Sequence, residues 1–222
     1  TMVSPATFIP LAERSGLIYP MTHALMKRVC ADVGAAHASR PHLNVAFNLY
    51  AGHFANEAII GDLKAIFAKS QISLSQIVLE VTEREPLPDL DLARNIIGRL
   101  QELGIRVAID DVGTGHGGLS YLMKLGVNAI KIDKMFIDAI STERHSQTII
   151  ETLLELARTM DIEVIAEGVE NFEQVEYLRR KGVHQAQGFV FAPALPASSY
   201  IALIEAMGQG PVVKPEAEAS AA

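Results

Sequence analysis

The chain has 222 residues, of which 49% are hydrophobic, and it carries a formal net charge of −7 and a single cysteine, Cys30. This length suits one domain of the β/α kind. A single cysteine cannot form an internal disulfide, and no stretch reaches the roughly 18 apolar residues of a membrane span. We expect no secretory leader and a cytoplasmic domain in a reducing compartment. The acidic balance also argues against a nucleic-acid polymer as partner.

Short apolar runs recur along the chain and predict β-strands. In chain order, the predicted strands are Leu43–Leu49, Ile77–Glu83, Ile105–Asp111, Ala129–Asp133, Ile162–Val169 and His184–Phe191. Runs such as Val-Ala-Ile are apolar throughout, which is typical of strands that are buried on both faces of a parallel sheet.

Longer amphipathic segments lie between these strands and predict helices. They are Met21–Ala38, Asn56–Ala68, Leu92–Leu103, Arg144–Met160, Phe172–Lys181 and Ser198–Met207. In the segment Thr148–Leu156, for example, apolar residues recur at helical spacing. Gly104, Gly126 and Gly182 come just after helical segments, where a left-handed residue commonly ends a helix.

The alternation of strands and helices favours a parallel sheet, either doubly wound or closed into a β/α barrel. If the fold is a barrel, the six predicted strands leave its first two strands missing from the chain as given. We expect one domain over residues 1–207 and a disordered tail over residues 208–222, which are small, polar and proline-containing. The stretch Gly113–Gly118 lacks the spacing of a dinucleotide-binding fingerprint.

Polar residues occupy a common position at or near the carboxyl ends of the predicted strands. They are Asn48, Glu80, Asp110, Asp111, Lys131, Glu167 and Gln187. In β/α barrels this face carries the active site. We therefore expect these side chains to converge at one mouth of the sheet.

Four of these residues are acids, and a buried carboxylate costs several kcal/mol unless a cation compensates it. Lys131 is the obvious cationic neighbour, so the excess negative charge predicts bound metal. Oxygen ligands without cysteine or histidine indicate a hard ion such as Mg²⁺ or Mn²⁺. Adjacent Asp110 and Asp111 could serve two ions, an arrangement typical of phosphoryl transfer, and Lys131 would hold or help activate the attacking water.

Each residue also has a structural interpretation. A single strand-end acid or amide commonly caps a helix or a loop, Asp-Asp before Gly is a common turn, and Lys131 could extend to solvent. We interpret Asp133 as a structural acid beside the following helix. Glu83 either caps a turn or braces the loop after Asp111. The seven histidines have no metal-ligand spacing. A functional site is favoured because these polar residues occur together, at the same end of successive strands.

At this point the sequence resembles a known family. The ordered motifs of EAL domains are matched by Glu80-Val-Thr-Glu83, Asp110-Asp-Val-Gly-Thr-Gly115, Lys131-Ile-Asp133, Ala166-Glu-Gly-Val-Glu170 and Gln187-Gly-Phe189. Ser4–Gly16 resembles the segment that follows the family's Glu-Ala-Leu strand, and Asn48-Leu resembles its Asn-Leu-Ser motif. The resemblance extends over residues 4–207 and implies a TIM-like β/α barrel of the EAL type.

The resemblance implies hydrolysis of cyclic di-GMP to linear pGpG. It implies that two ions are held by the metal ligands Asn48, Glu80, Asp110, Asp111 and Glu167. Lys131 would position the nucleophilic water, and Gln187 would join the metal–water or substrate network. Glu83 would steady the loop Val112–Ser120, which in this family links the active site to the interface of a homodimer. An upstream sensory or membrane domain is expected in the parent protein.

The sequence also departs from the family pattern. Val112 replaces a phenylalanine, His116-Gly-Gly118 replaces Tyr-Ser-Ser, and Pro193-Ala194 stands where a basic residue and proline are usual. The Glu-Ala-Leu motif itself, with a metal-ligating Glu and a substrate-side Arg, is absent, which we interpret as truncation. Two alternatives to an active phosphodiesterase are an inactive domain that acts as a cyclic di-GMP receptor and a pure protein-interaction module.

Overall fold

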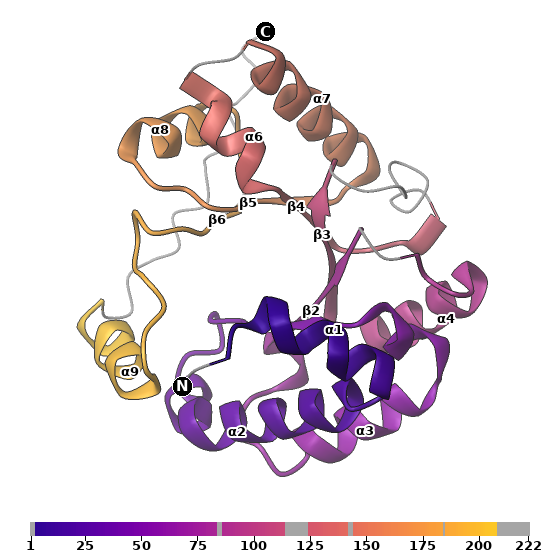
Figure 1. Cartoon of the computed structure of the whole chain (residues 1–222). Helices are drawn as coiled ribbons and strands as arrows, with labels where there is room; N and C mark the ends of the chain where they lie inside the picture. The colour runs from indigo at the N-terminus through magenta and orange to yellow at the C-terminus, as the bar shows by residue number, and fades with distance from the viewer. Residues whose placement is uncertain (1–2, 84–85, 114–123, 142–143, 184, 208–222) are drawn as a thin grey trace, which may run out of the picture.

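The computed structural model describes residues 3–83, 86–113, 124–141, 144–183 and 185–207. Within these residues six strands form one parallel sheet in the order β1-β2-β3-β4-β5-β6. The strands are β1 (Val45–Leu49), β2 (Ile77–Thr82), β3 (Arg106–Val112), β4 (Ala129–Ile132), β5 (Glu163–Ala166) and β6 (Gln185–Ala186). The sheet curls around a central axis with helices on its outside (Figure 1), so the fold is a partial TIM-like barrel.

Eight α-helices accompany the strands in the described residues. They are α1 (Pro5–Ser15), α2 (Ile18–Ala38), α3 (Ala58–Phe67), α4 (Leu90–Glu102), α6 (Lys134–Asp138), α7 (Arg144–Met160), α8 (Phe172–Arg180) and α9 (Ala197–Ala206). Three short 3₁₀ helices are η1 (Ala51–Ala55), η2 (Leu74–Gln76) and η3 (Ala139–Ser141). None of the described helices is both long and apolar enough to cross a bilayer.

The predicted helices are present, but two further ones, α1 and α6, were not predicted. α1 contains a proline at its start and Pro10 in its interior, and it ends at Gly16, whose φ of 74° is left-handed. The sequence did not predict α1 because an interior proline such as Pro10 removes a backbone hydrogen bond and so argues against a helix. α6 has only five residues, too few for a periodic pattern, and its N-cap is Asp133, whose side chain accepts from Met135 N at 2.7 Å. The interpretation of Asp133 as a structural acid is therefore confirmed.

The predicted strand His184–Phe191 was wrong for most of its length, since β6 covers only Gln185–Ala186. The chain turns at Gly188, where a Cβ would lie 2.1 Å from the carbonyl oxygen of Val169. This close approach of two backbones ends the extended conformation. The strand predicted over 162–169 is likewise shorter, at Glu163–Ala166. The left-handed glycines after helices are confirmed, with φ of 87° at Gly104, 65° at Gly126 and 76° at Gly182.

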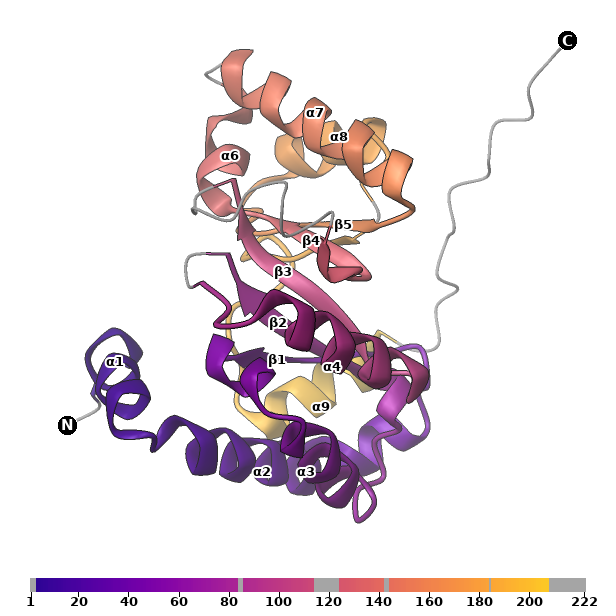
Figure 2. The ribbon, with the colours of Figure 1, turned by 90° about the vertical axis from the view of Figure 1, so that its right-hand side faces the viewer.

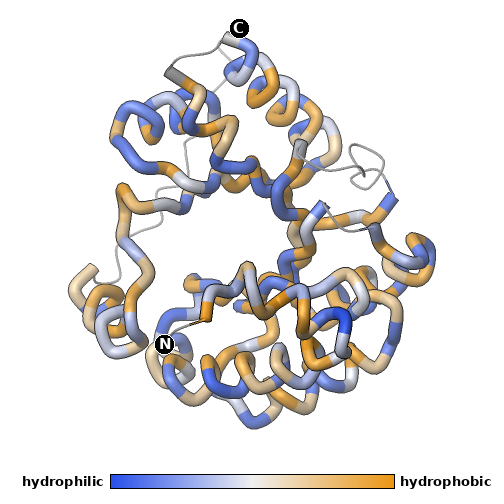
Figure 3. The backbone as a smooth tube through the Cα atoms, in the orientation of Figure 1, coloured by the Kyte–Doolittle hydropathy of each residue, from blue (hydrophilic) through white to orange (hydrophobic). Residues whose placement is uncertain are grey.

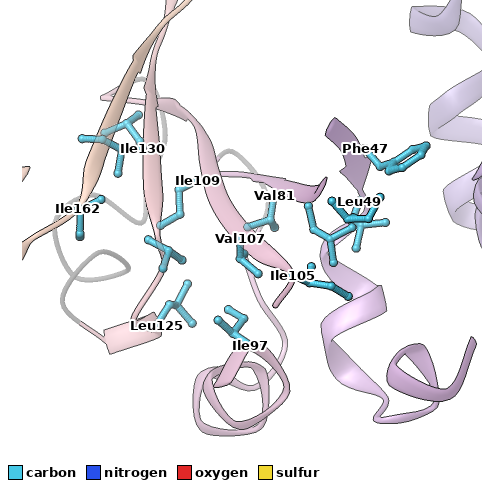
Figure 4. Close-up of a cluster of buried hydrophobic side chains, with 14 of the residues drawn as sticks. Phe47, Leu49, Val81, Ile97, Ile105, Val107, Ile109, Leu125, Ile130 and Ile162 are labelled. Carbon is cyan, nitrogen blue, oxygen red and sulfur yellow. The ribbon is translucent and has the colours of Figure 1, made fainter. Parts of the chain in front are cut away.

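Alternation along each strand separates two faces. On β2, Ile77, Leu79 and Val81 are buried in the main core. The same core includes Ile97 of α4, which lies near Val107 of β3 (Figure 4). Val78 points to the inside of the curl, where it packs with Ala108, Ala129 and Ile165 in a second, small cluster. Hydrophilic and hydrophobic residues accordingly alternate along the backbone tube (Figure 3).

The two outer strands of the sheet lie on either side of an open part of the ring. In the described residues, β1 pairs only with β2 and β6 pairs only with β5. After β6 the chain runs across to α9, which lies beside α2 in both views (Figures 1 and 2). Thus the C-terminal helix, not a strand, reaches the β1 side of the ring.

Candidate metal centre

The inner side chains at the carboxyl end of the sheet are polar, strand after strand. Asn48 on β1 lies opposite Glu80 on β2, and Thr82 lies opposite Asp110 on β3. Lys131 lies on β4, while Glu167 and Gln187 come directly after β5 and β6. The structure therefore places these predicted site residues at one end of the curled sheet, as parallel strands require.

The ammonium group of Lys131 lies at the centre of these residues. Its Nζ is 2.7 Å from Glu80 Oε2 and 3.3 Å from Asp110 Oδ1, and it also contacts Glu167 Oε1. The Lys131 side chain is only 3% exposed. A lysine this deeply buried is stable only when anions surround it, and three carboxylates do so here.

The electrostatics of this cluster are those of excess negative charge. Burial raises the pKa of Glu80, against the opposing effect of Lys131. Burial likewise raises the pKa of Glu167, to about 7. For Lys131, burial lowers the pKa, but Glu80, Asp110 and Glu167 outweigh it and raise the pKa above its ordinary value. Lys131 therefore remains protonated, whereas burial makes ionisation of Glu80 and Glu167 less favourable than in water.

A β-bulge brings both aspartates of the pair to this end of the sheet. Adjacent residues of a regular strand point to opposite faces, so only one of Asp110 and Asp111 would face inward. The register between β3 and β4 shifts between Ile109 and Val112, and Asp111 has a left-handed φ of 58°. Asp110 Oδ1 accepts a hydrogen bond from Asp111 N at 2.9 Å, which helps to hold this conformation.

Asp110, Asp111 and Glu167 form a group that fits a metal ion. Each offers one carboxylate oxygen, and these oxygens lie within 4.8 Å of one another. All three residues are half-buried. Oxygen donors with a net negative charge suit hard divalent cations. Glu80 is bound to Lys131, and Asn48 is exposed beside it. The donor chemistry therefore fits the cofactors expected from the sequence, without specifying which ion.

Glu83 connects the ends of two neighbouring strands. Its Oε2 accepts from Gly113 N at 2.8 Å, and its backbone N donates to Asp110 O at 3.1 Å. Gly113 has a left-handed φ of 95°. These two bonds hold the backbone on both sides of Asp111. Most of the loop that Glu83 was expected to steady lies outside the described residues, as do His116 and the tail from residue 208.

Gln187 links β6 to the carboxylate cluster. Its Nε2 donates to Glu167 Oε1, its backbone N donates to Ala166 O at 2.8 Å, and its carbonyl accepts from Val169 N at 3.0 Å. Sequence reasoning placed Gln187 inside a strand and gave no reason for Gly188. The signal was the glycine itself, because a glycine in a strand pattern often marks a close backbone approach.

A second inward ion pair lies at the opposite, amino end of the strands, and sequence reasoning missed it. Arg106 Nη1 donates to Glu163 Oε2 at 3.1 Å. A cavity of about 180 Å³ extends from Arg106 to Glu80 and Gln187 along the inside of the curl. A larger groove, of about 720 Å³, lies instead between α2 and α3, where His23, Lys27 and Lys69 line it. Of these two cavities, the smaller one adjoins the carboxylates.

Comparisons with known proteins agree with this arrangement. A family model described as the EAL domain matches residues 1–194. The chain is 37% identical over 216 residues to the probable cyclic di-GMP phosphodiesterase PdeG of Escherichia coli K12, a match covering 96% of this chain and 41% of that protein. The chain thus spans less than half the length of that relative.

Solved structures resemble the fold as well. The PaMucR phosphodiesterase in complex with c-di-GMP is 31% identical, with a TM-score of 0.81, and the match covers 89% of this chain and 81% of that one. The manganese and cyclic di-GMP complex of Klebsiella pneumoniae BlrP1 is 27% identical, with a TM-score of 0.66, and the match covers 76% of this chain and 44% of that one.

Proposed function

The chain belongs to the EAL domain family, and on that basis we propose that it hydrolyses one phosphodiester bond of cyclic di-GMP to give linear pGpG. The observation that carries the proposal is the convergence of Asp110, Asp111 and Glu167 beside the buried ammonium of Lys131. The names of PdeG and of the PaMucR complex support the choice of substrate.

We propose two divalent cations, Mg²⁺ or Mn²⁺, as cofactors. Asn48, Glu80, Asp110, Asp111 and Glu167 would hold them, and the oxygen-only donor set supports this choice of ion. When bound, such cations would offset the charge of the phosphate and lower the pKa of a water molecule. The manganese in the BlrP1 complex supports a divalent ion in this family.

The side chains around Lys131 have distinct roles in this proposal. Lys131 is held in its charged form by three carboxylate neighbours, and its Nζ could donate to the attacking water or to the phosphate once a bound cation takes over one of these carboxylates. Glu167 has a pKa of about 7 in the cation-free site, and its oxygens can hold a proton near neutral pH. Gln187 donates to Glu167 Oε1 and so fixes the orientation of that carboxylate.

Two other functions compete with hydrolysis. A receptor would bind cyclic di-GMP without turnover, and an interaction module would bind neither nucleotide nor metal. The retention of Asp110, Asp111, Lys131 and Glu167 together favours hydrolysis, because neither alternative requires a buried acid cluster that costs stability. Metal-dependent turnover selects the enzyme, and binding alone selects the receptor.

The test is pGpG release by the purified full-length protein with Mn²⁺ or with EDTA. We expect Asp110→Asn to abolish release while the fold is retained, because losing one charge relieves repulsion among the acids yet weakens cation binding. Asp161→Asn is the matched control. Asp161 is exposed, and its φ of 56° is left-handed like that of Asp111, a conformation that asparagine tolerates. Wild-type turnover in Asp110→Asn, or no metal-dependent turnover in the native protein, refutes the proposal.

We further propose that the domain works as a cytoplasmic homodimer, with the segment after Asp111 at the interface, under an upstream sensory or membrane domain. The contact between Glu83 and Gly113 supports a link from the site to that segment. The match covers only 41% of PdeG, which supports additional domains in the parent protein. Sedimentation velocity at micromolar concentration tests the dimer, and a fully active monomer excludes it.

A further inference from the structure

In the part of the chain that the structure describes, a polar contact fixes helix α9 to the opposite side of the ring. Tyr200 on α9 and His37 at the end of α2 share a hydrogen bond of 2.9 Å between Tyr200 Oη and His37 Nε2. Their rings stack, with centroids 5.9 Å apart and planes inclined by 22°. Around this contact, Tyr200 and Ile201 pack against the main core. α9 therefore holds the end of the segment that begins at Gln187.

His37 is an unusual residue for such a contact because it is almost fully buried, at 1% exposure. Within the described residues its Nδ1 has no hydrogen-bond partner. The carbonyls of His37 and Arg40 both accept from Gln76 Nε2, at 3.2 and 3.0 Å, which fixes the backbone here. The imidazole therefore cannot readily turn toward solvent without disturbing the end of α2.

The charges around His37 disfavour its protonation. Burial lowers the pKa of His37, and the Arg40 guanidinium lowers it further, while the Leu43 carbonyl opposes the change. The charge of Arg40 also lowers the pKa of Tyr200, which burial raises, so Arg40 acts on both groups of this contact. A protonated imidazole would place a positive charge in this buried position, and within the described residues only the Leu43 carbonyl offsets part of that cost.

We propose that the contact between His37 and Tyr200 is an acid-labile clasp that fixes α9, and with it the Gln187 segment, against α2. The sign follows from the direction of the pKa shift. A histidine whose pKa is lowered by folding stabilises the closed clasp at pH values above its ordinary 6.5, and this stability is lost as pH falls through the lower, folded value. Acid would then release α9 while the sheet stays folded, because Tyr200 and Ile201 are only partly buried at the margin of the main core, whereas strand residues such as Leu79 are fully buried within it.

The consequence for the site is an altered position of Gln187. The segment 187–196 is held at its start by the contacts of Gln187 with Ala166, Glu167 and Val169, and at its end by α9. Phe189 and Phe191 within it are 70% and 56% exposed, so they anchor it little. When the clasp opens, the segment 187–196 stays attached to the sheet through the contacts of Gln187 and Val190.

The test is hydrogen exchange measured by mass spectrometry at pH 7.5 and pH 5.5, with protection corrected for intrinsic exchange. We expect protection of α9 to fall roughly five-fold or more at the lower pH, the scale of one buried hydrogen bond. Peptides from β2 should keep their protection. His37→Gln should retain α9 protection at both values, because the Gln amide can bind the Tyr200 hydroxyl but does not titrate. Tyr200→Phe should lower protection at both values and reduce the dependence on pH.

His42→Gln is the matched control, since His42 is exposed just beyond α2, and it should behave like the native protein. Equal α9 protection at the two pH values in the native protein overturns the clasp. So does a parallel loss in α9 and β2, which would indicate global unfolding, or an undiminished pH response in His37→Gln. If His37→Gln fails to fold, the reduced pH response of Tyr200→Phe decides the question alone.

Discussion

Lys131→Met is the substitution for which the structure gives the clearest expected magnitude. It removes the ammonium group that lies 2.7 Å from Glu80 Oε2 and 3.3 Å from Asp110 Oδ1, and it leaves an apolar chain of similar length. Removing one partner of a buried ion pair costs about 3–5 kcal/mol, against about 5–15 kcal/mol for a whole domain. Without divalent cations at pH 8, we expect a loss of about 3 kcal/mol in the free energy of unfolding.

The assay is urea denaturation followed by circular dichroism, in EDTA and again in Mn²⁺. Mn²⁺ should recover part of the loss, because bound cations would offset the negative charge of the carboxylates that Lys131 offsets in the native protein. Lys134→Met is the control. Lys134 has pairs of similar length, 2.7 Å to Asp138 and 2.8 Å to Glu170, but its side chain is 46% exposed. That loss should stay within about 1 kcal/mol. Equal losses in the two variants would refute the reasoning from burial.

Two further outcomes follow from the site. Gly188→Ala should displace the Gln187 segment and lower pGpG release, because a Cβ there would lie 2.1 Å from Val169 O, whereas Gly98→Ala in open space on α4 should leave release unchanged. In EDTA, the free energy of unfolding should fall as pH rises from about 4.5 to 7, since folding raises the pKa of Glu167 from 4.5 to about 7. The contribution of Glu167 is on the order of 3 kcal/mol, and Glu167→Gln should reduce the slope in a urea titration against pH, with the remainder coming from Glu80, whose pKa folding also raises.

The strands and the strand-end residues could be predicted because each depends on local pattern. Apolar runs define β1 to β5, and polar residues at the ends of those runs mark the mouth of a parallel sheet. The burial of Lys131 among three acids needs the register of β2, β3 and β4, which no local pattern contains. The choice between a doubly wound sheet and a barrel depends equally on how the sheet curls.

Other features were beyond the sequence for specific physical reasons. Asp110 and Asp111 face the same end only because of a bulge and a left-handed φ of 58° at Asp111, and many residue pairs could bear such a bulge. The short β6 depends on contact between Gly188 and Val169, which are distant in sequence. The clasp between His37 and Tyr200 joins residues 163 positions apart.

The alternation of faces along the strands also restricts how the chain can change in length. On β2, deleting one residue before Glu80 would exchange the inward and outward sets, so that a carboxylate would enter the core against α4 while Leu79 faced the mouth. Insertions and deletions should therefore be tolerated only between the strands, where the register is not affected. Domains with this architecture can therefore diverge through changes in loop length while the lengths of their strands stay constant.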